Sequence, residues 1–562
     1  MDPSKWNGTG DAEMKRELFY STYPLPGFMV LLVLFLVPVC MTLGQAFVVD
    51  GGFSFSLIAS TFTDPYYLRI MAFTLIQALC STLASLLIGL PGAYLMTTYR
   101  FPGKRLLKTL YTIPFVLPSI LVVLGFVIFY GNSGFLNKAI MAVFGLKEPP
   151  LRILYSFTAV LLAHAFYNFP VVVSIVGDYW QRLDSSCESA ASTLGSKRAK
   201  VFKTITLPRL APSILSAASL VFLFCFTSFA IILVLGGGPA LTTTEVEIYR
   251  LARISMDTGR ACALSLFSML VAIVAMFVYS AAQRRQNHGE ALGNQNAKLE
   301  RKPRGFGQHL GIIIYLVFSL LFILCPILSI VARSLLGNAT RSGGLTFSLA
   351  AYERLFAAGS SNLKSVAASV AIALASSLLA TAAALRICTS IARSNKAGVA
   401  TDVAVMLPMV TSSVIVGLSY FIVSKYMKFM PPFVLVVLAH CVITMPFVVR
   451  TILPVYRKIP ENLVNASYTL GFGARQTFRK VIRPILMPAM LTGMVFSFAM
   501  SMGELNATLL LGTTSMQTIP IQIYRLISSY NYQGACALGS ILILVCFVVF
   551  FISETLKRRS YV

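Results

Sequence analysis

The stretch ESAASTLGSKRAKVFKTITLP occupies residues 188–208, between two long apolar segments, and a related stretch, NASYTLGFGARQTFRKVIRP, occupies 465–484. Both are short, basic and rich in small residues. Each copy carries a glycine, a phenylalanine seven residues later and a proline six residues further on: Gly195, Phe202 and Pro208 in the first, Gly471, Phe478 and Pro484 in the second. The repetition indicates that the chain is built as a duplication around these two stretches.

The composition is that of a membrane protein. Of 562 residues, 57% are hydrophobic and only 12% are charged, which is about half the share of charge in an ordinary soluble domain. Apolar runs of about 20 residues recur, long enough to cross a hydrocarbon core of ~30 Å. A net charge of +26 can indicate nucleic-acid binding, but here Lys and Arg gather in alternate loops, as the positive-inside rule requires. No nucleic-acid partner is therefore expected.

Twelve apolar segments are expected to cross the membrane, and they must be helices because lipid offers no partner to backbone groups. They lie at 27–47, 68–96, 109–130, 153–177, 211–236, 259–281, 310–333, 363–389, 403–424, 431–452, 486–511 and 536–554. The sequence thus predicts an all-α membrane protein of two six-helix halves, 1–281 and 309–562. The polar stretch 282–308 between them is interpreted as a flexible cytoplasmic linker.

Two further observations orient the halves. The basic loops alternate so that both termini and both repeated stretches are expected in the cytoplasm. Residues also recur at an offset of 276, as in His164 and His440 or Pro170 and Pro446. Repeats in the same orientation predict two halves related by an axis along the membrane normal. A secondary transporter, the alternative from another class, more typically has inverted repeats.

The repeated stretches can each form a short helix, a turn and a second short helix. Residues 188–194 and 464–470 are expected to be helical, with small residues on the surface where a partner could approach closely: Ala190, Ala191, Ala466 and Ser467. The glycines can turn the chain because glycine tolerates positive φ. The phenylalanines would anchor the second short helix, and the prolines would start the next membrane helix. A merely solvated connection is the alternative, but two matching copies on one side favour docking.

This frame resembles the "EAA" loop of permease subunits of binding-protein-dependent ABC importers, and the chain resembles both halves of a type I importer permease fused together. The resemblance implies a bacterial inner-membrane transport subunit, not an enzyme. Two cytoplasmic ATPases would dock on the loops and bind ATP, and a periplasmic or lipid-tethered binding protein would meet the outer loops at 237–258 and 513–533. The chain itself holds no GxxxxGK[ST] phosphate loop and is expected to bind no cofactor.

The chain departs from the family at one position of each loop. Six residues before each glycine the family usually has Glu, whereas Ser189 and Asn465 stand here, with Glu188 one place earlier than Ser189. This departure affects the salt bridge that the family Glu would make, and it leaves the expected docking in place.

Segments of the first half point to a substrate class. FPGKR at 101–105, IPFVLPSI at 113–120, AHAFYNFP at 163–170 and FTSFAIILVLGGGPALTTTEVEIYR at 226–250 resemble fused thiamine and iron(III) permeases, and the last resembles the thiamine members most. MGELNATLLL at 502–511 suits iron(III) or 2-aminoethylphosphonate permeases as well. Thiamine is the predicted substrate, with these two as alternatives.

One acidic residue suggests a translocation pathway. Glu504 lies in an apolar segment, where an ionisable group is a functional hypothesis by default, and Asn506 follows it. The 276 offset pairs Glu504 with Ser228, beside Thr227. A lone carboxylate there would favour a cation. His164 and His440 are interpreted as interhelical hydrogen-bonding residues, and no metal site is expected.

Overall fold

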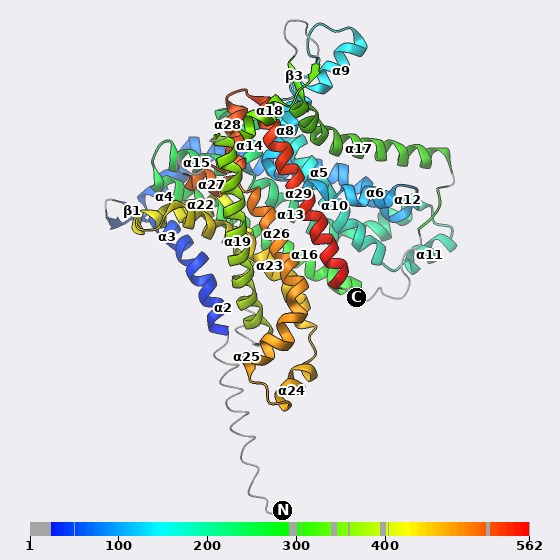
Figure 1. Cartoon of the computed structure of the whole chain (residues 1–562). Helices are drawn as coiled ribbons and strands as arrows, with labels where there is room; N and C mark the ends of the chain where they lie inside the picture. Colours follow the sequence, from blue (N-terminus) through cyan, green and yellow to red (C-terminus); the bar gives the residue numbers. More distant parts are fainter. Residues whose placement is uncertain are drawn as a thin grey trace, which may run out of the picture. The chain divides into compact units, whose positions relative to one another are not determined.

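The computed structural model describes residues 24–49, 51–291, 300–303, 305–338, 345–357, 360–393, 401–402, 404–512 and 517–560. These residues are mostly helical (Figure 1). Among them, short antiparallel strand pairs join β1 (Val48–Val49) to β2 (Gly52–Phe53) and β3 (Leu336–Asn338) to β4 (Leu345–Phe347). The expectation of an all-α membrane protein is confirmed.

Eleven helices in the described ranges are long and apolar enough to cross a membrane: Gly27–Gln45, Pro65–Thr98, Ser119–Phe144, Phe157–Arg182, Ala199–Phe226, Thr258–Gln286, Phe306–Leu335, Ser361–Ala392, Pro432–Arg457, Ala474–Met502 and Tyr532–Val549. The remaining expected segment, 403–424, corresponds to the shorter apolar helix α22 (Ser413–Tyr426). Its counterpart in the first half, α8 (Ser119–Tyr130), is short as well, with 12 residues.

By contacts the chain divides into two compact units. One unit comprises 46–355 and 523–540. Its helical elements are α4 (Ser56–Thr63), α5 (Pro65–Thr98), α6 (Lys104–Leu110), α7 (Ile113–Val116), α8, α9 (Phe135–Phe144), α10 (Phe157–Arg182), α11 (Ser186–Thr193), α12 (Arg198–Val201), η3 (Phe202–Thr206), α13 (Leu207–Phe226), α14 (Ala230–Leu235), η4 (Pro239–Leu241), α15 (Thr244–Arg253), α16 (Thr258–Ala291), α17 (Phe306–Leu335) and most of α18 (Ala350–Phe356).

The other unit comprises 1–45, 356–522 and 541–562. Its helical elements are α2 (Pro24–Leu31), η2 (Leu32–Leu36), α3 (Val37–Gln45), α19 (Ser361–Arg393), α21 (Leu407–Val410), α22, α23 (Pro432–Arg457), α24 (Glu461–Thr469), α25 (Ala474–Thr477), η5 (Phe478–Ile482), α26 (Arg483–Met502) and α27 (Asn506–Leu511). The boundary between the units cuts α28 (Ile519–Ser528) and α29 (Tyr532–Ser560).

The first helix of each sequence half packs in the unit that holds most of the other half. The N-terminal α2 packs on α19 and α3 packs on α22, whereas α17 packs on α8. The compact units therefore differ from the sequence halves 1–281 and 309–562. The division into these halves describes the sequence repeat and stays a prediction. The expectation of a flexible linker was wrong for 282–291, which continue α16 as helix. Residues 292–299 of the expected linker and 513–516 of the outer loop 513–533 lie outside the described residues.

Small residues let the helices of each unit approach closely. A Cβ added to Gly89 of α5 would lie 2.6 Å from Cβ of Val172 in α10. In the other unit, a Cβ on Gly493 of α26 would lie 2.9 Å from a methyl group of Val448 in α23. Close backbone approach is a usual basis of helix packing in membranes, where apolar burial gives little drive.

Two expected spans are interrupted. The segment 211–236 divides into α13 and α14, and 486–511 divides into α26 and α27. At the first break the backbone N–H and the hydroxyl of Thr227 both donate to the carbonyl of Leu223, at 3.0 and 2.9 Å. Gly503 occupies the second break. The expectation of two unbroken helices was wrong because each break is short and the apolar residues on both sides of it form a run long enough to cross a membrane.

Candidate functional site

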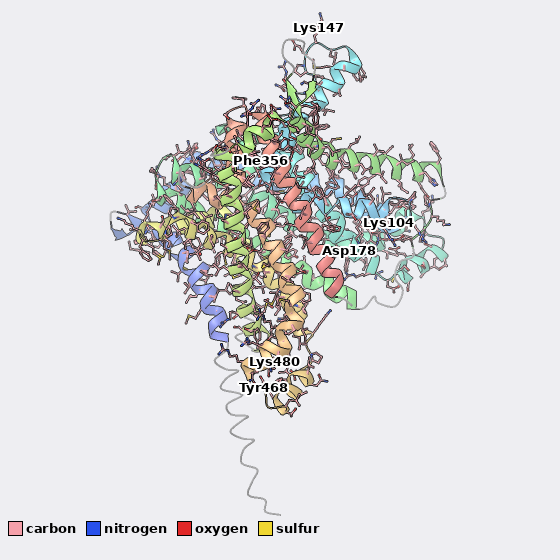
Figure 2. All side chains as sticks on the ribbon, viewed as in Figure 1. Lys104, Lys147, Asp178, Phe356, Tyr468 and Lys480 are labelled. Atoms are coloured by element: carbon pink, nitrogen blue, oxygen red, sulfur yellow. The ribbon has the colours of Figure 1, made fainter. Side chains whose placement is uncertain are left out.

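The two repeated stretches fold alike. The first consists of α11, a turn at Gly195, α12 and the π-helical segment η3. The second consists of α24, a turn at Gly471, α25 and the π-helical segment η5. In Figure 1, α24 and α25 lie beyond the end of α23, and Figure 2 labels Tyr468 and Lys480 there. We call 186–208 loop 1 and 461–484 loop 2.

Each glycine ends a short helix in the left-handed region. Gly195 has a φ of +79° and Gly471 has a φ of +84°. The Gly195 N–H donates to Ser192 O and the next N–H donates to Ala191 O, both within 3.1 Å. The same two bonds recur after α24 at 2.9 and 3.1 Å. This is the Schellman pattern, in which a residue at positive φ satisfies the last helical carbonyls, so the predicted glycine turns are confirmed.

The prolines follow the start of the next helix instead of forming it. Helix begins at Arg198 in loop 1 and at Ala474 in loop 2, and it continues through the π segment into α13 or α26. The N–H before Pro208 donates to the carbonyl of Phe202, five residues back. Since proline has no N–H, a wider turn beside it lets a continuous helix tolerate the missing bond. Pro484 follows an equivalent segment.

The tips of the two loops expose some equivalent side chains. Ala190 and Ala466 are exposed and Ala191 is half-buried, but the expectation of an exposed Ser467 was wrong, because its hydroxyl bonds that of Thr477 inside the loop. A leucine precedes each glycine and is largely free of the chain: Leu194 is 84% exposed and Leu470 is 76% exposed. Sequence reasoning missed this pair, although the repeated Thr-Leu-Gly tripeptide could have indicated it. Each loop thus exposes one apolar leucine side chain beside small residues.

Side-chain hydrogen bonds hold the two arms of each loop together. In loop 1 the Thr206 hydroxyl donates to Oε1 of Glu188 at 2.8 Å. In loop 2 the hydroxyls of Ser467 and Thr477 lie 2.5 Å apart. Asn465, at the position of the family Glu, is exposed, as is Ser189. Glu188 therefore braces loop 1 from within.

The side chains of Phe202 and Phe478 pack toward the membrane helices of their own units. Phe202 is 38% exposed and its ring centre lies 6.0 Å from that of Trp180 at the end of α10. Phe478 is partly buried against the core of its own unit. Both side chains join the second arm of a loop to the body of the protein.

The candidate pathway residues lie at the two helix breaks. Thr227 and Ser228 follow α13 in one unit, while in the other Glu504 lies between α26 and α27 and Asn506 begins α27. The Glu504 carboxylate accepts from the Ala507 N–H at 3.1 Å, and Asn506 donates to the Ser413 hydroxyl at 2.8 Å. The local bonds shape each break, and a role in transport stays a prediction.

The two histidines form interhelical hydrogen bonds, as expected. Nδ1 of His164 lies 2.8 Å from Gln77 and 3.0 Å from Ser81 of α5. His440 lies 2.7 Å from Ser501 and 2.7 Å from Thr508. Within the described ranges, no group of three His, Cys, Asp or Glu side chains could hold a metal ion.

The chain matches the family of binding-protein-dependent transport system inner membrane components at residues 85–288 and again at 391–560. These matches cover more than half of the chain, and the chain belongs to this family. It is therefore a multi-pass inner-membrane permease of an ABC importer, with both halves in one polypeptide, and it is a transport component and not an enzyme.

Individual relatives differ in how much of the chain they cover. The thiamine transport system permease protein ThiP of Brucella suis is 28% identical over 519 residues, which span 90% of each chain. A 2-aminoethylphosphonate transport permease, PhnU of Salmonella paratyphi A, is 27% identical and covers 48% of this chain and 92% of its own length. A crystallised bacterial alginate ABC transporter aligns with 51% of this chain and 99% of its own, at 18% identity and a TM-score of 0.41.

Proposed function

We propose that this permease imports thiamine. The carrying observation is the extent of the alignment, because the thiamine permease relatives share the fused length of this chain and the phosphonate relative matches only half of it. The resemblance of 226–250 to thiamine permeases and the single carboxylate of Glu504 at a helix break agree with a cationic substrate. Iron(III), also cationic, is the second candidate.

Loops 1 and 2 are the proposed docking points for two ATPase subunits on the cytoplasmic side. Support comes from the matched turns and from the exposed Leu194 and Leu470, which offer an apolar contact that the chain itself does not cover. ATP would bind those partner subunits. Both termini lie on this side in the proposed orientation, and a binding protein would reach the opposite face near α15.

Uptake of labelled thiamine and of labelled ferric iron, measured in cells with and without the chain, tests the substrate. We expect thiamine uptake to be lost when the chain is removed, while iron uptake is unchanged. Loss of iron uptake alone would transfer the assignment to iron(III). If neither changes, the family membership stands and 2-aminoethylphosphonate becomes the substrate to test.

A further inference from the structure

Two adjoining cavities lie where α5, α6, α10 and α17 meet, all within the unit that contains 46–355. The first has a volume of about 590 Å³ and is lined by the end of α5, by α6 and by the last turns of α10. Since α10 leads directly into loop 1, this cavity lies on the loop side of the membrane helices. The functions that the family resemblance implies do not account for this cavity.

The first cavity carries an excess of positive charge. Its basic side chains outnumber its acidic ones: Arg100, Lys104, Arg105 and Lys108 against Asp178 and Glu300. Lys104 pairs with Glu300 at 2.7 Å, and Lys108 lies 3.6 Å from Asp178; Figure 2 labels Lys104 and Asp178. Among the ion pairs of the described residues none uses Arg100 or Arg105. Two exposed guanidinium groups are therefore available to an anion.

The end of the linker lies beside this cavity, and Glu300 lines it. Arg301 pairs with the chain after α5 in parallel fashion, because the Arg100 N–H donates to Arg301 O at 3.0 Å and the Arg301 N–H donates to Thr98 O at 2.9 Å. These bonds bring Glu300 and Lys302 against the first half. Residues 300–303 are thus docked, where a flexible linker was expected.

The second cavity is an apolar groove that continues from the first. It has a volume of about 700 Å³ and shares Arg100 and Phe101 with the basic cavity. Apart from Lys302 and His309, its other lining residues are apolar: Pro102, Pro303, Ile312, Ile313 and Leu316. Neighbouring side chains of α17 are exposed as on a lipid-facing helix, with Ile313 at 57% and Ile314 at 59%.

We propose that the two cavities together bind one anionic phospholipid, with its phosphate at Arg100, Arg105 and Lys302 and an acyl chain along Ile313. Guanidinium groups bind phosphate oxygens in bidentate fashion, and basic pockets beside membrane helices on the cytoplasmic side suit acidic head groups. The apolar groove favours a lipid over a soluble anion, because a soluble anion would leave the apolar side chains of the groove uncovered. The assignment of the lipid to the cytoplasmic leaflet rests on the proposed orientation of the chain. The assignment of an anionic lipid to the two cavities does not depend on that orientation.

Lipid retention tests this site on the full chain purified without ATPases. The chain is incubated with phosphatidylglycerol or with phosphatidylcholine of the same acyl chains, and retained lipid is counted by native mass spectrometry. We expect phosphatidylglycerol to be retained preferentially, and Arg100→Gln/Lys302→Gln to retain about tenfold less of it. Arg285→Gln/Lys458→Gln, which removes the same charge from exposed positions elsewhere, serves as the control and should retain it as the wild type does.

A second matched pair tests the groove. Ile313→Trp fills it and should reduce phosphatidylglycerol retention, whereas Ile314→Trp, equally exposed but outside the groove, should not. Equal retention by Arg100→Gln/Lys302→Gln and the wild type, or equal retention of the two lipids, would overturn the site. If inorganic phosphate displaces the lipid and Ile313→Trp has no effect, the occupant is a soluble phosphate and the lipid assignment is wrong. Because retention is measured without transport, failure to import thiamine leaves the outcome unaffected.

Discussion

Loops 1 and 2 share one backbone path, yet the contacts that close them have exchanged chemistry. In loop 1 the contact between the first helix and the π segment is polar, through Glu188 and Thr206. At an offset of 276 these positions are Val464 and Ile482 in loop 2. Ile482 belongs to the apolar core of that unit, and Val464 packs on this core. The same place is thus held by a hydrogen bond in one loop and by apolar contact in the other.

A second pair is exchanged in the opposite sense. Loop 2 joins Ser467 to Thr477 by their hydroxyls, whereas the corresponding residues of loop 1 are Ala191 and the buried Val201. Replacing one partner of a buried hydrogen bond leaves the other unsatisfied, but replacing both by apolar groups can be nearly neutral. Both members of each pair therefore differ together between the loops, while the turn between them is the same.

The shared turn should give the largest effect when it is broken. Gly195→Val combined with Gly471→Val forces a branched side chain into the left-handed region, at a cost of roughly 1–2 kcal/mol or more for each loop. We expect the double variant to insert in the membrane but to lose co-purification of the ATPase. Gly473→Val is the control, since Gly473 has a φ of −71° and its Cβ would meet open space. Retained co-purification in the double variant would contradict the docking assignment.

The exchanged pairs predict a rescue. Glu188→Val alone leaves the buried Thr206 hydroxyl without this acceptor, which should cost about 1–3 kcal/mol and speed amide hydrogen exchange in α11. Glu188→Val/Thr206→Ile copies the loop 2 pair and should recover most of the protection. Exchange in α24 provides the internal reference. If the double variant is no better protected than the single one, the two pairs are not equivalent solutions.

An ion pair with reversed sign allows a smaller test. Lys108 lies 3.6 Å from Asp178, and both side chains are more than half exposed. Before the third helix of each half the offset is 294, as in Pro114 and Pro408, so Asp402 aligns with Lys108. Asp402 lies 3.2 Å from both Arg450 and Arg457 and is 23% exposed. Surface pairs contribute ~0–1 kcal/mol, so Asp402→Asn should lower the melting temperature more than Lys108→Met does. Equal shifts in a thermal melt would show that burial of Asp402 adds nothing.

Much of this architecture follows from sequence, and the exceptions have a physical cause. The spans, the duplication and the turns at Gly195 and Gly471 could be predicted because they depend on local hydrophobicity and on positive φ. The exchange of α2 and α17 between units could not, since packing between remote apolar helices leaves no periodic signal. The π segments before Pro208 and Pro484 were also missed, because proline marks a missing donor without saying how the helix adapts to it.

The start of each first helix gives the smallest contrast, and it depends on pH. Oδ1 of Asp184 accepts hydrogen bonds from the Ser186 hydroxyl at 2.6 Å and from its N–H at 3.0 Å, and these bonds hold the pKa of Asp184 below its usual value. The position aligned with Asp184 in loop 2 is Pro460, which cannot titrate.

A lowered folded-state pKa gives stability above the unfolded value of about 3.9 and loses it as the pH falls through the folded value. We therefore expect hydrogen-exchange protection of α11, corrected for intrinsic rates, to fall slightly below a pH of about 4, while Asp184→Asn shows no such step. Equal losses in α11 and α24 would indicate general acid unfolding. A step confined to α11 would show that the same helix start is fixed by a charge in one loop and by a proline ring in the other.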